Sequence, residues 1–180
     1  MKSPEKVVDH IANWLKNYLQ ISKMKGFVVG VSGGIDSAVT SALCARTGAP
    51  VLCLEMAIHQ EENQISRALD HIQWLKKSYK NVSHHSLELT PFFESFIECL
   101  PPTEKRKQQL LSLANTRARL RMSTLYYFAA LHNYLVAGTG NKVEDFGVGF
   151  YTKYGDGGVD ISPIADCNKT EVWELGKELG

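Results

Sequence analysis

The residues best suited to chemistry lie in one short run, which reads Gly-Val-Ser-Gly-Gly-Ile-Asp-Ser. Its adjacent glycines let the backbone approach an anion closely, and its serines add hydroxyl donors. An apolar strand-like run precedes it and a helical pattern follows, so that N-terminal helix amides point at the same anion. We therefore predict a phosphate-binding loop made of Gly30, Val31, Ser32, Gly33, Gly34, Ile35, Asp36 and Ser37.

Asp36 is the one carboxylate in this loop. A carboxylate beside a phosphate repels it unless a cation lies between them, so the motif suggests Mg²⁺ bridging Asp36 and a polyphosphate. No lysine follows the glycines, which excludes the Walker-type loop. An ordinary Gly-Gly turn with a serine cap is the alternative interpretation of the same residues.

Strand and helix patterns alternate along the chain and predict the framework around this loop. Because strands alternate with helices, we expect an α/β fold with a doubly wound parallel sheet flanked by helices. Ligands of such sheets bind at the carboxyl ends of the strands, so the loop and Thr139 are predicted to face one crevice. Strands are expected at 26–31, 50–58, 82–89 and 135–138, helices at 4–19, 37–46, 61–80, 92–100, 110–134 and from 168, and a mobile connector at 103–109.

Size and composition fit one globular domain and exclude several function classes. The 180 residues are 44% hydrophobic and 22% charged, with a formal net charge of +1. A charge so near zero argues against sequence-independent nucleic-acid binding. No run is apolar enough to cross a membrane, and residues 1–6 lack the apolar core of a signal peptide, so we expect a cytoplasmic protein.

The cysteines and histidines show no catalytic or metal-binding pattern. Cys44, Cys53, Cys99 and Cys167 form no C-x-x-C pair, so we expect reduced, mostly buried thiols rather than a zinc site or a disulfide framework. We interpret the six histidines as structural.

Four motifs in one order along the chain carry a resemblance to a known family. The loop SGGIDS resembles that of the N-type ATP pyrophosphatases, which adenylate an oxygen of their substrate and release pyrophosphate. The runs NTRARLRM at 115–122, LVAGTGNKVE at 135–144 and TKYGDGG at 152–158 resemble the NAD synthetase family in particular. The resemblance implies a Rossmann-like, adenine nucleotide alpha-hydrolase-like fold and a homodimer with the long helix near the subunit contact.

The resemblance also implies a reaction. The expected enzyme is a ligase that amidates nicotinic acid adenine dinucleotide (deamido-NAD) to NAD through an adenylated intermediate, with release of AMP and pyrophosphate. Because the chain begins almost at the synthetase domain, we expect free ammonia as the nitrogen source. The family normally continues beyond the position of Gly180, so residues 1–180 are expected to be a single domain that lacks the family's C-terminal portion.

Two other hypotheses stay open beside this one. The chain could be another N-type ATP pyrophosphatase, such as a GMP synthetase-like or tRNA-modifying enzyme, or a non-catalytic nucleotide-binding fragment.

Site residues follow from the resemblance by position. ATP is expected to contact the phosphate loop, Thr139 and Lys169, and Lys169 is expected to offset the charge on departing pyrophosphate. Asp36 and Lys169 are thus the expected catalytic residues. Mg²⁺ is expected at Asp36 and Glu144, although one extra residue between Glu144 and Lys153 leaves Asp145 open as the second carboxylate.

Deamido-NAD itself carries a pyrophosphate and a carboxylate, so it needs cations and a hydrogen-bond acceptor. The resemblance implies Arg119 and Lys153 as the cations and Asp160 as the acceptor. Arg117, Arg119 and Arg121 alternate and cannot share one helix face, and the motif favours Arg119 among them.

Overall fold

The computed structural model describes residues 3–180, so Met1 and Lys2, the start of the N-terminal segment considered above, lie outside the described residues. Its centre is a four-stranded parallel sheet with the strand order β3-β2-β1-β4. After β3 the chain therefore crosses back over the sheet and adds β4 on the other side of β1. The strands are β1 (Gly26–Gly30), β2 (Val51–Ala57), β3 (Val82–Glu88) and β4 (Tyr134–Val136).

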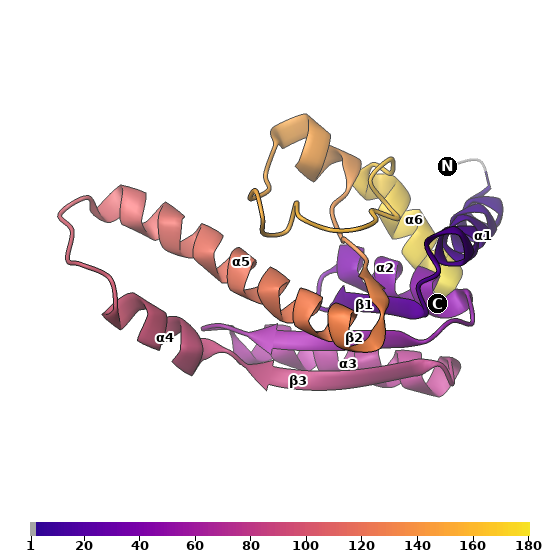
Figure 1. Ribbon diagram of the computed structural model, residues 1–180. Helices are drawn as coiled ribbons and strands as arrows, with labels where there is room; N and C mark the ends of the chain where they lie inside the picture. The colour runs from indigo at the N-terminus through magenta and orange to yellow at the C-terminus, as the bar shows by residue number, and fades with distance from the viewer. Residues whose placement is uncertain (1–2) are drawn as a thin grey trace.

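Helices cover both faces of this sheet (Figure 1). The first and last helices, α1 and α6, lie side by side against α2, and α5 runs as a long rod across the sheet toward α4. The helices are α1 (Pro4–Ser22), α2 (Ile35–Arg46), α3 (Glu62–Ser78), α4 (Thr90–Glu98), α5 (Arg106–His132) and α6 (Lys169–Leu179), with a π-helical segment η1 (Val143–Val148).

Alternation of side chains along the strands produces two hydrophobic clusters. Phe27 and Val29 of β1 face one cluster, which α1, α2, α3 and α6 close. Val28 faces the other cluster, where Met122 and Leu125 of α5 cover β1, β2 and β4. Successive strand residues point to opposite faces, so strands buried on both faces read as continuous apolar runs. The predicted doubly wound α/β fold is confirmed.

Two boundaries of α5 differ from the prediction. The helix begins at Arg106, so the expected connector at 103–109 is wrong over its second half. Residues 106–109 (Arg-Lys-Gln-Gln) are good helix formers, and their charge does not prevent a solvated first turn. The helix also ends at His132 rather than at 134, because Asn133 adopts a left-handed conformation with φ of 57° and turns the chain into β4.

The segment between β4 and α6 contains the η1 turn, which no pattern in the sequence predicted. Ala137 and Ile161 form a parallel bridge that returns the chain alongside β4. Throughout residues 3–180, none of the helices combines the length and apolar character needed to cross a bilayer.

Candidate active site

The loop after β1 has the geometry of an anion site. Gly33 has φ of +77°, and a Cβ there would lie 2.7 Å from the backbone oxygen of Gln64, so glycine is required. Ser37 Oγ accepts the Ser32 N–H at 3.2 Å and donates to the Gly34 carbonyl at 2.9 Å. α2 starts at Ile35 without a side-chain cap, so its first N–H groups remain available to an anion.

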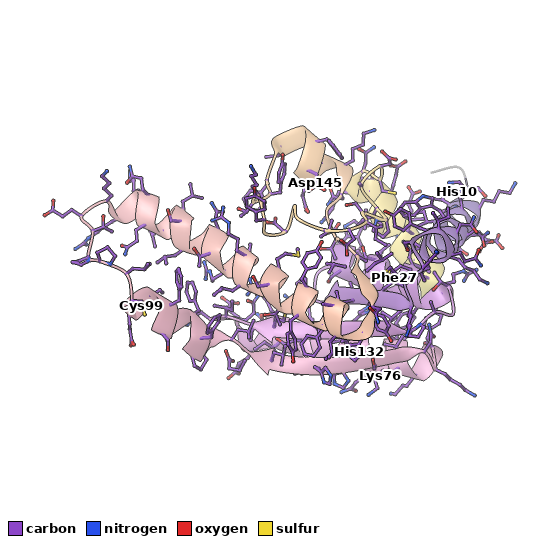
Figure 2. The ribbon with its side chains drawn as sticks, in the orientation of Figure 1. His10, Phe27, Lys76, Cys99, His132 and Asp145 are labelled. Carbon is purple, nitrogen blue, oxygen red and sulfur yellow. The ribbon has the colours of Figure 1, made fainter. Side chains whose placement is uncertain are left out.

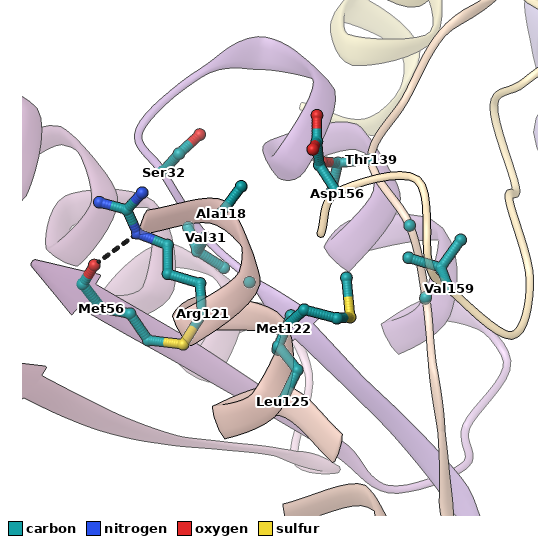
Figure 3. Close-up of a pocket in the computed structure, with 13 residues that line it drawn as sticks. Val31, Ser32, Met56, Ala118, Arg121, Met122, Leu125, Thr139, Asp156 and Val159 are labelled. Carbon is teal, nitrogen blue, oxygen red and sulfur yellow. Dashed lines mark hydrogen bonds between the residues drawn. The ribbon is translucent and has the colours of Figure 1, made fainter. Parts of the chain in front are cut away.

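The loop and Thr139 line one cavity of about 300 Å³ at the carboxyl ends of β1 and β4 (Figure 3). Ser32 contributes from the loop, Asp156 from the long return segment, and α5 closes one side. The predicted crevice is therefore present, at the point where the strand order reverses. α5 contributes Ala118, Arg121, Met122 and Leu125 to its lining.

Lys169, the first residue of α6, joins the two carboxylates that were expected to share a metal. Its ammonium donates to Asp36 Oδ2 and, at 3.2 Å, to Glu144 Oε1. The Asp36 side chain is 15% exposed, whereas those of Glu144 and Lys169 are 42% exposed. Burial lowers the pKa of Lys169, but the hydrogen bonds to Asp36 and Glu144 outweigh burial, so the pKa is raised. Lys169 is thus held in its charged form.

Asp145 lies elsewhere, although it is adjacent to Glu144 in the sequence. Its carboxylate lies against Gly140, where any Cβ would overlap the carboxylate atoms. Burial and the nearby charges of Glu144 and Asp156 raise the pKa of Asp145. The structure therefore brings Glu144, and not Asp145, to Asp36 and Lys169.

The pair Asp36 and Glu144 fits a hard cation that also binds phosphate. Within residues 3–180, no group of three or more His, Cys, Asp and Glu side chains forms a metal site made by protein alone. Mg²⁺ commonly takes only one or two carboxylates and completes its shell with phosphate oxygens and water. The two carboxylates already converge on one positive charge, the Lys169 ammonium, so the donor set suits Mg²⁺.

The residues expected to contact the dinucleotide form two groups. Arg119 Nε donates to the Lys153 carbonyl at 3.1 Å, and the Lys153 ammonium lies 5.0 Å from the centre of the Tyr154 ring. Asp160 instead accepts the Tyr126 hydroxyl at 2.9 Å and the Val136 N–H at 2.8 Å. Burial and the bond to Asp160 raise the pKa of Tyr126 to about 12. Both Asp160 oxygens therefore have a partner inside the chain.

Two residues of the site were missed at the sequence level, Arg121 and Asn141. Arg121 Nε donates to the Met56 carbonyl at 2.9 Å and its Nη2 to Gln60 Oε1 at 3.0 Å, in the cavity wall (Figure 3). Burial and nearby Arg117 lower its pKa. The spacing of the sequence could have indicated Arg121, because it lies four residues, or one helical turn, before the apolar Leu125, on the side of α5 that faces the sheet.

The histidines that the structure describes take no part in these contacts to Asp36, Glu144 and Lys169. His71 Nε2 makes a hydrogen bond with Ser41 Oγ of α2 at 2.9 Å. His132 lies on the opposite side of the molecule from Asp145, which marks the η1 segment (Figure 2).

Comparison with known proteins identifies the family of the chain. The NAD synthase family model matches residues 7–180. The NH(3)-dependent NAD(+) synthetase of Carboxydothermus hydrogenoformans is 36% identical over 182 residues, which cover 98% of this chain and 70% of that protein. The corresponding enzyme of Methanosarcina acetivorans is 37% identical and covers 98% and 67%.

Solved structures give the same result. The NMN synthetase from Francisella tularensis superposes with a TM-score of 0.87 at 35% identity, covering 98% of this chain and 71% of that one. The NH3-dependent NAD synthetase from Campylobacter jejuni, in complex with the nitrate ion, gives 0.85 at 33% identity and covers 98% and 73%. The fold, the phosphate loop and these matches agree, and the chain belongs to the NAD synthase family.

Proposed function

We propose that the chain amidates deamido-NAD with ammonia in an ATP-dependent reaction that yields NAD, AMP and pyrophosphate. One observation carries the proposal beyond family membership. Lys169 gathers Asp36, which belongs to the phosphate loop, and Glu144, which lies five residues after Thr139, while Ser32 of the same loop and Thr139 line one cavity. That arrangement supplies what adenylation needs, namely an anion cradle, two acidic ligands and a cation.

Each group has a task in the first half-reaction. A carboxylate oxygen of deamido-NAD bonds to the α-phosphorus of ATP while the bond from that phosphorus to the pyrophosphate oxygen breaks. The loop amides and the Ser32 hydroxyl hold the β- and γ-phosphates, whereas Ser37 keeps the loop closed through its bond to the Gly34 carbonyl. Lys169 offsets the charge on the departing pyrophosphate. Ammonia then attacks the activated acyl carbon, expels AMP and loses a proton.

Asp36 and Glu144 are the residues that would hold Mg²⁺. The metal, when bound, neutralises charge on the polyphosphate as a Lewis acid. Lys169 shows that these carboxylates accept a cation between them. Arg119, Lys153 and Asp160 are proposed to contact deamido-NAD. Arg119 and Lys153 support this role because both are exposed and adjacent to each other.

The acceptor has one specific competitor. The Francisella structure, at 35% identity, bears the name NMN synthetase, so nicotinic acid mononucleotide is the second candidate acceptor. It offers the same carboxylate without the adenylate half of the dinucleotide.

A product assay tests both acceptors. The purified chain is given ATP, Mg²⁺ and ammonium with either deamido-NAD or nicotinic acid mononucleotide, and NAD or NMN is measured alongside pyrophosphate. We expect NAD and pyrophosphate in equal amounts, and more product from ammonium than from glutamine. Efficient product from the mononucleotide alone would assign the second function. No product from either acceptor, from a folded chain that binds ATP, would contradict both.

Homodimerisation is part of the same proposal. Leu110, Leu111, Tyr127 and Leu131 of α5 are between 60% and 70% exposed, which is unusual for a set of large apolar side chains on one helix. We expect this surface to bury against a second copy, and sedimentation velocity should show a dimer that Leu131→Glu weakens. A monomer at all concentrations would contradict this expectation.

The cytoplasm is the proposed location. The four cysteines are free thiols in the structure, and three of them are buried, which suits a reducing compartment.

A further inference from the structure

Asn141 is a fully buried polar side chain between the two segments of the site. Its exposed fraction is 0%. Its Nδ2 donates to Asp36 Oδ1 at 2.9 Å. Its Oδ1 accepts the backbone N–H groups of Val143 at 3.0 Å and Glu144 at 3.2 Å. One side chain therefore contacts one expected metal ligand directly and fixes the backbone that carries the other.

The chemistry of these three partners leaves only one orientation for the amide. A backbone N–H only donates and an ionised carboxylate only accepts, so the oxygen of Asn141 must face η1 and its nitrogen must face Asp36. A side chain with only acceptors, or with neither donor nor acceptor, would leave at least one partner unsatisfied in a buried place. The position requires a group with a donor at one end and an acceptor at the other.

Further contacts hold Asn141 itself in place. Its own carbonyl accepts the Asp145 N–H at 3.0 Å, and the next residue, Lys142, donates its N–H to the Cys167 carbonyl at 3.0 Å. The second contact ties the start of η1 to the chain just before α6, which begins at Lys169. Asp36 is thus approached from two directions, by Asn141 at Oδ1 and by Lys169 at Oδ2.

We propose that Asn141 is a positioning residue that holds the Asp36 and Glu144 carboxylates at the spacing a shared divalent cation needs. The inference rests on the proposed function, because it takes these two carboxylates as the metal ligands. η1 has no buried residue of its own, so Glu144 is held toward Asp36 by polar links alone: Asn141, the Lys142 bond to the Cys167 carbonyl, and the Lys169 ammonium. Groups that orient metal ligands commonly affect metal affinity although they do not touch the metal.

Two substitutions separate the two contacts of Asn141. In Asn141→Ser, the hydroxyl lies close to the backbone and can still accept from the start of η1, as serine does in helix caps, but it is too short to reach Asp36. In Asn141→Ala both contacts are lost. Asn81→Ser is the matched control. Like Asn141, Asn81 bonds two backbone groups through its side-chain amide, but its partners are the carbonyls of Ala45 and Ala49, away from the site.

Metal binding is the main measurement. Electron paramagnetic resonance follows Mn²⁺ binding to each variant in the presence of α,β-methylene ATP, an analogue that cannot transfer its adenylyl group because a methylene group replaces the oxygen between its α- and β-phosphorus atoms. We expect both Asn141 variants to bind Mn²⁺ about 10- to 100-fold more weakly, and Asn81→Ser to differ little from the unsubstituted chain. Hydrogen exchange at the Val143 and Glu144 amides should stay slow in Asn141→Ser and become fast in Asn141→Ala.

The outcomes are distinct. Unchanged affinity in Asn141→Ser with lower affinity in Asn141→Ala would mean that Asn141 only caps η1, which overturns the inference. Unchanged affinity in both variants overturns it as well. No Mn²⁺ binding by the unsubstituted chain would instead refute the proposed metal site, and the inference with it.

A measurement without substitution covers the case in which the variants fail to fold. Mg²⁺ is titrated into the unsubstituted chain with the same nucleotide analogue, and the side-chain amide resonances of Asn141 are followed by NMR. We expect them to shift in step with metal binding, more than those of Asn81. Resonances that do not move while the metal binds would overturn the inference.

Discussion

The phosphate loop and the return segment after β4 meet at the same site but are held there in different ways. The loop joins a fully buried stretch of β1 to α2, whose residues are mostly buried, and its own serines close it by short-range hydrogen bonds. The return segment contains η1, with no buried residues, and long exposed stretches. Its Asn141 side chain bonds to Asp36, and Lys169, at the start of the helix that follows the segment, bonds to the same carboxylate.

This difference assigns distinct tasks to the two regions. The loop, called the cradle below, is closed by its own hydrogen bonds, whereas the return segment, called the tether below, is linked to it at the Asp36 carboxylate. Substitutions in the tether should therefore change metal and substrate affinity while the fold stays intact. Substitutions in the buried sheet that carries the loop should instead change the free energy of unfolding.

The largest effect is expected at Lys169. Lys169→Met removes the cation that faces Asp36 and Glu144. The kcat for NAD formation should then fall by about 100-fold or more, as for loss of a preorganised charge. Lys169→Arg should recover part of the activity. Steady-state kinetics that measure NAD and pyrophosphate together check this prediction. An unchanged kcat in Lys169→Met would show that Lys169 is not catalytic.

A smaller effect separates the two neighbouring acids. Glu144→Gln should raise the Mg²⁺ concentration needed for half-maximal activity by about 10-fold or more, since it weakens one ligand of the pair. Asp145→Asn should have a clearly smaller effect, because its carboxylate faces Gly140. Magnesium titrations of both variants make the comparison, and the reverse order of effects would assign the metal to Asp145.

Arg119 of α5 tests the outer part of the return segment, because its Nε donates to the Lys153 carbonyl there. Arg119→Ala should raise the KM for deamido-NAD by about 10-fold, consistent with loss of one charge-assisted hydrogen bond, and should change the KM for ATP much less. Arg117→Ala is the matched control, because the Arg117 guanidinium lies 5.9 Å from the centre of the Phe93 ring instead. Equal changes in both Michaelis constants would contradict the assigned role of Arg119.

The smallest effect is expected in the buried sheet, at Glu55 of β2. Burial, and then the charge of Glu88, raises the pKa of Glu55 above its ordinary value of 4.5, although Arg121 partly opposes this. A raised pKa means that the folded state binds the proton of Glu55 more tightly than the unfolded state does. The contribution of this carboxyl to the free energy of unfolding is therefore greatest below pH 4.5 and is lost as the pH rises through the folded pKa.

Glu55→Gln lacks this titration. We expect its free energy of unfolding to exceed that of the unsubstituted chain at neutral pH and to come close to it near pH 4, where the Glu55 carboxyl is protonated in both states. Urea denaturation at the two pH values provides the measurement. A variant that is less stable at neutral pH would show that the attraction to Arg121 outweighs burial.

The same contrast explains what could be predicted from the sequence. The loop was predicted residue by residue because its glycines and serines act through local backbone geometry, which the sequence spells out directly. The parallel, doubly wound sheet followed from the alternation of strands with helices, and the shared crevice followed from the strand ends, whereas the strand order itself came only from the structure.

The return segment contains the features that local sequence patterns did not predict. Nothing in its local pattern predicts η1 or the role of Asn141, because both depend on a partner 105 residues away, Asp36. The choice between Glu144 and Asp145 was open for the same reason, since spacing alone does not say which carboxylate turns toward the loop. The bonds from Asp160 to Tyr126 and β4 likewise needed three-dimensional contacts.

The central claim is that the cradle and the tether together adenylate the dinucleotide. Its most direct test is a single-turnover experiment without ammonium, in which the chain is mixed with ATP labelled at the α-phosphate, Mg²⁺ and deamido-NAD and then quenched. We predict that the unsubstituted chain transfers labelled AMP to the dinucleotide and releases one pyrophosphate for each transfer, whereas Asp36→Asn binds ATP but forms the adenylate far more slowly. Equal adenylation by Asp36→Asn, or pyrophosphate release without an adenylated dinucleotide, would contradict the account.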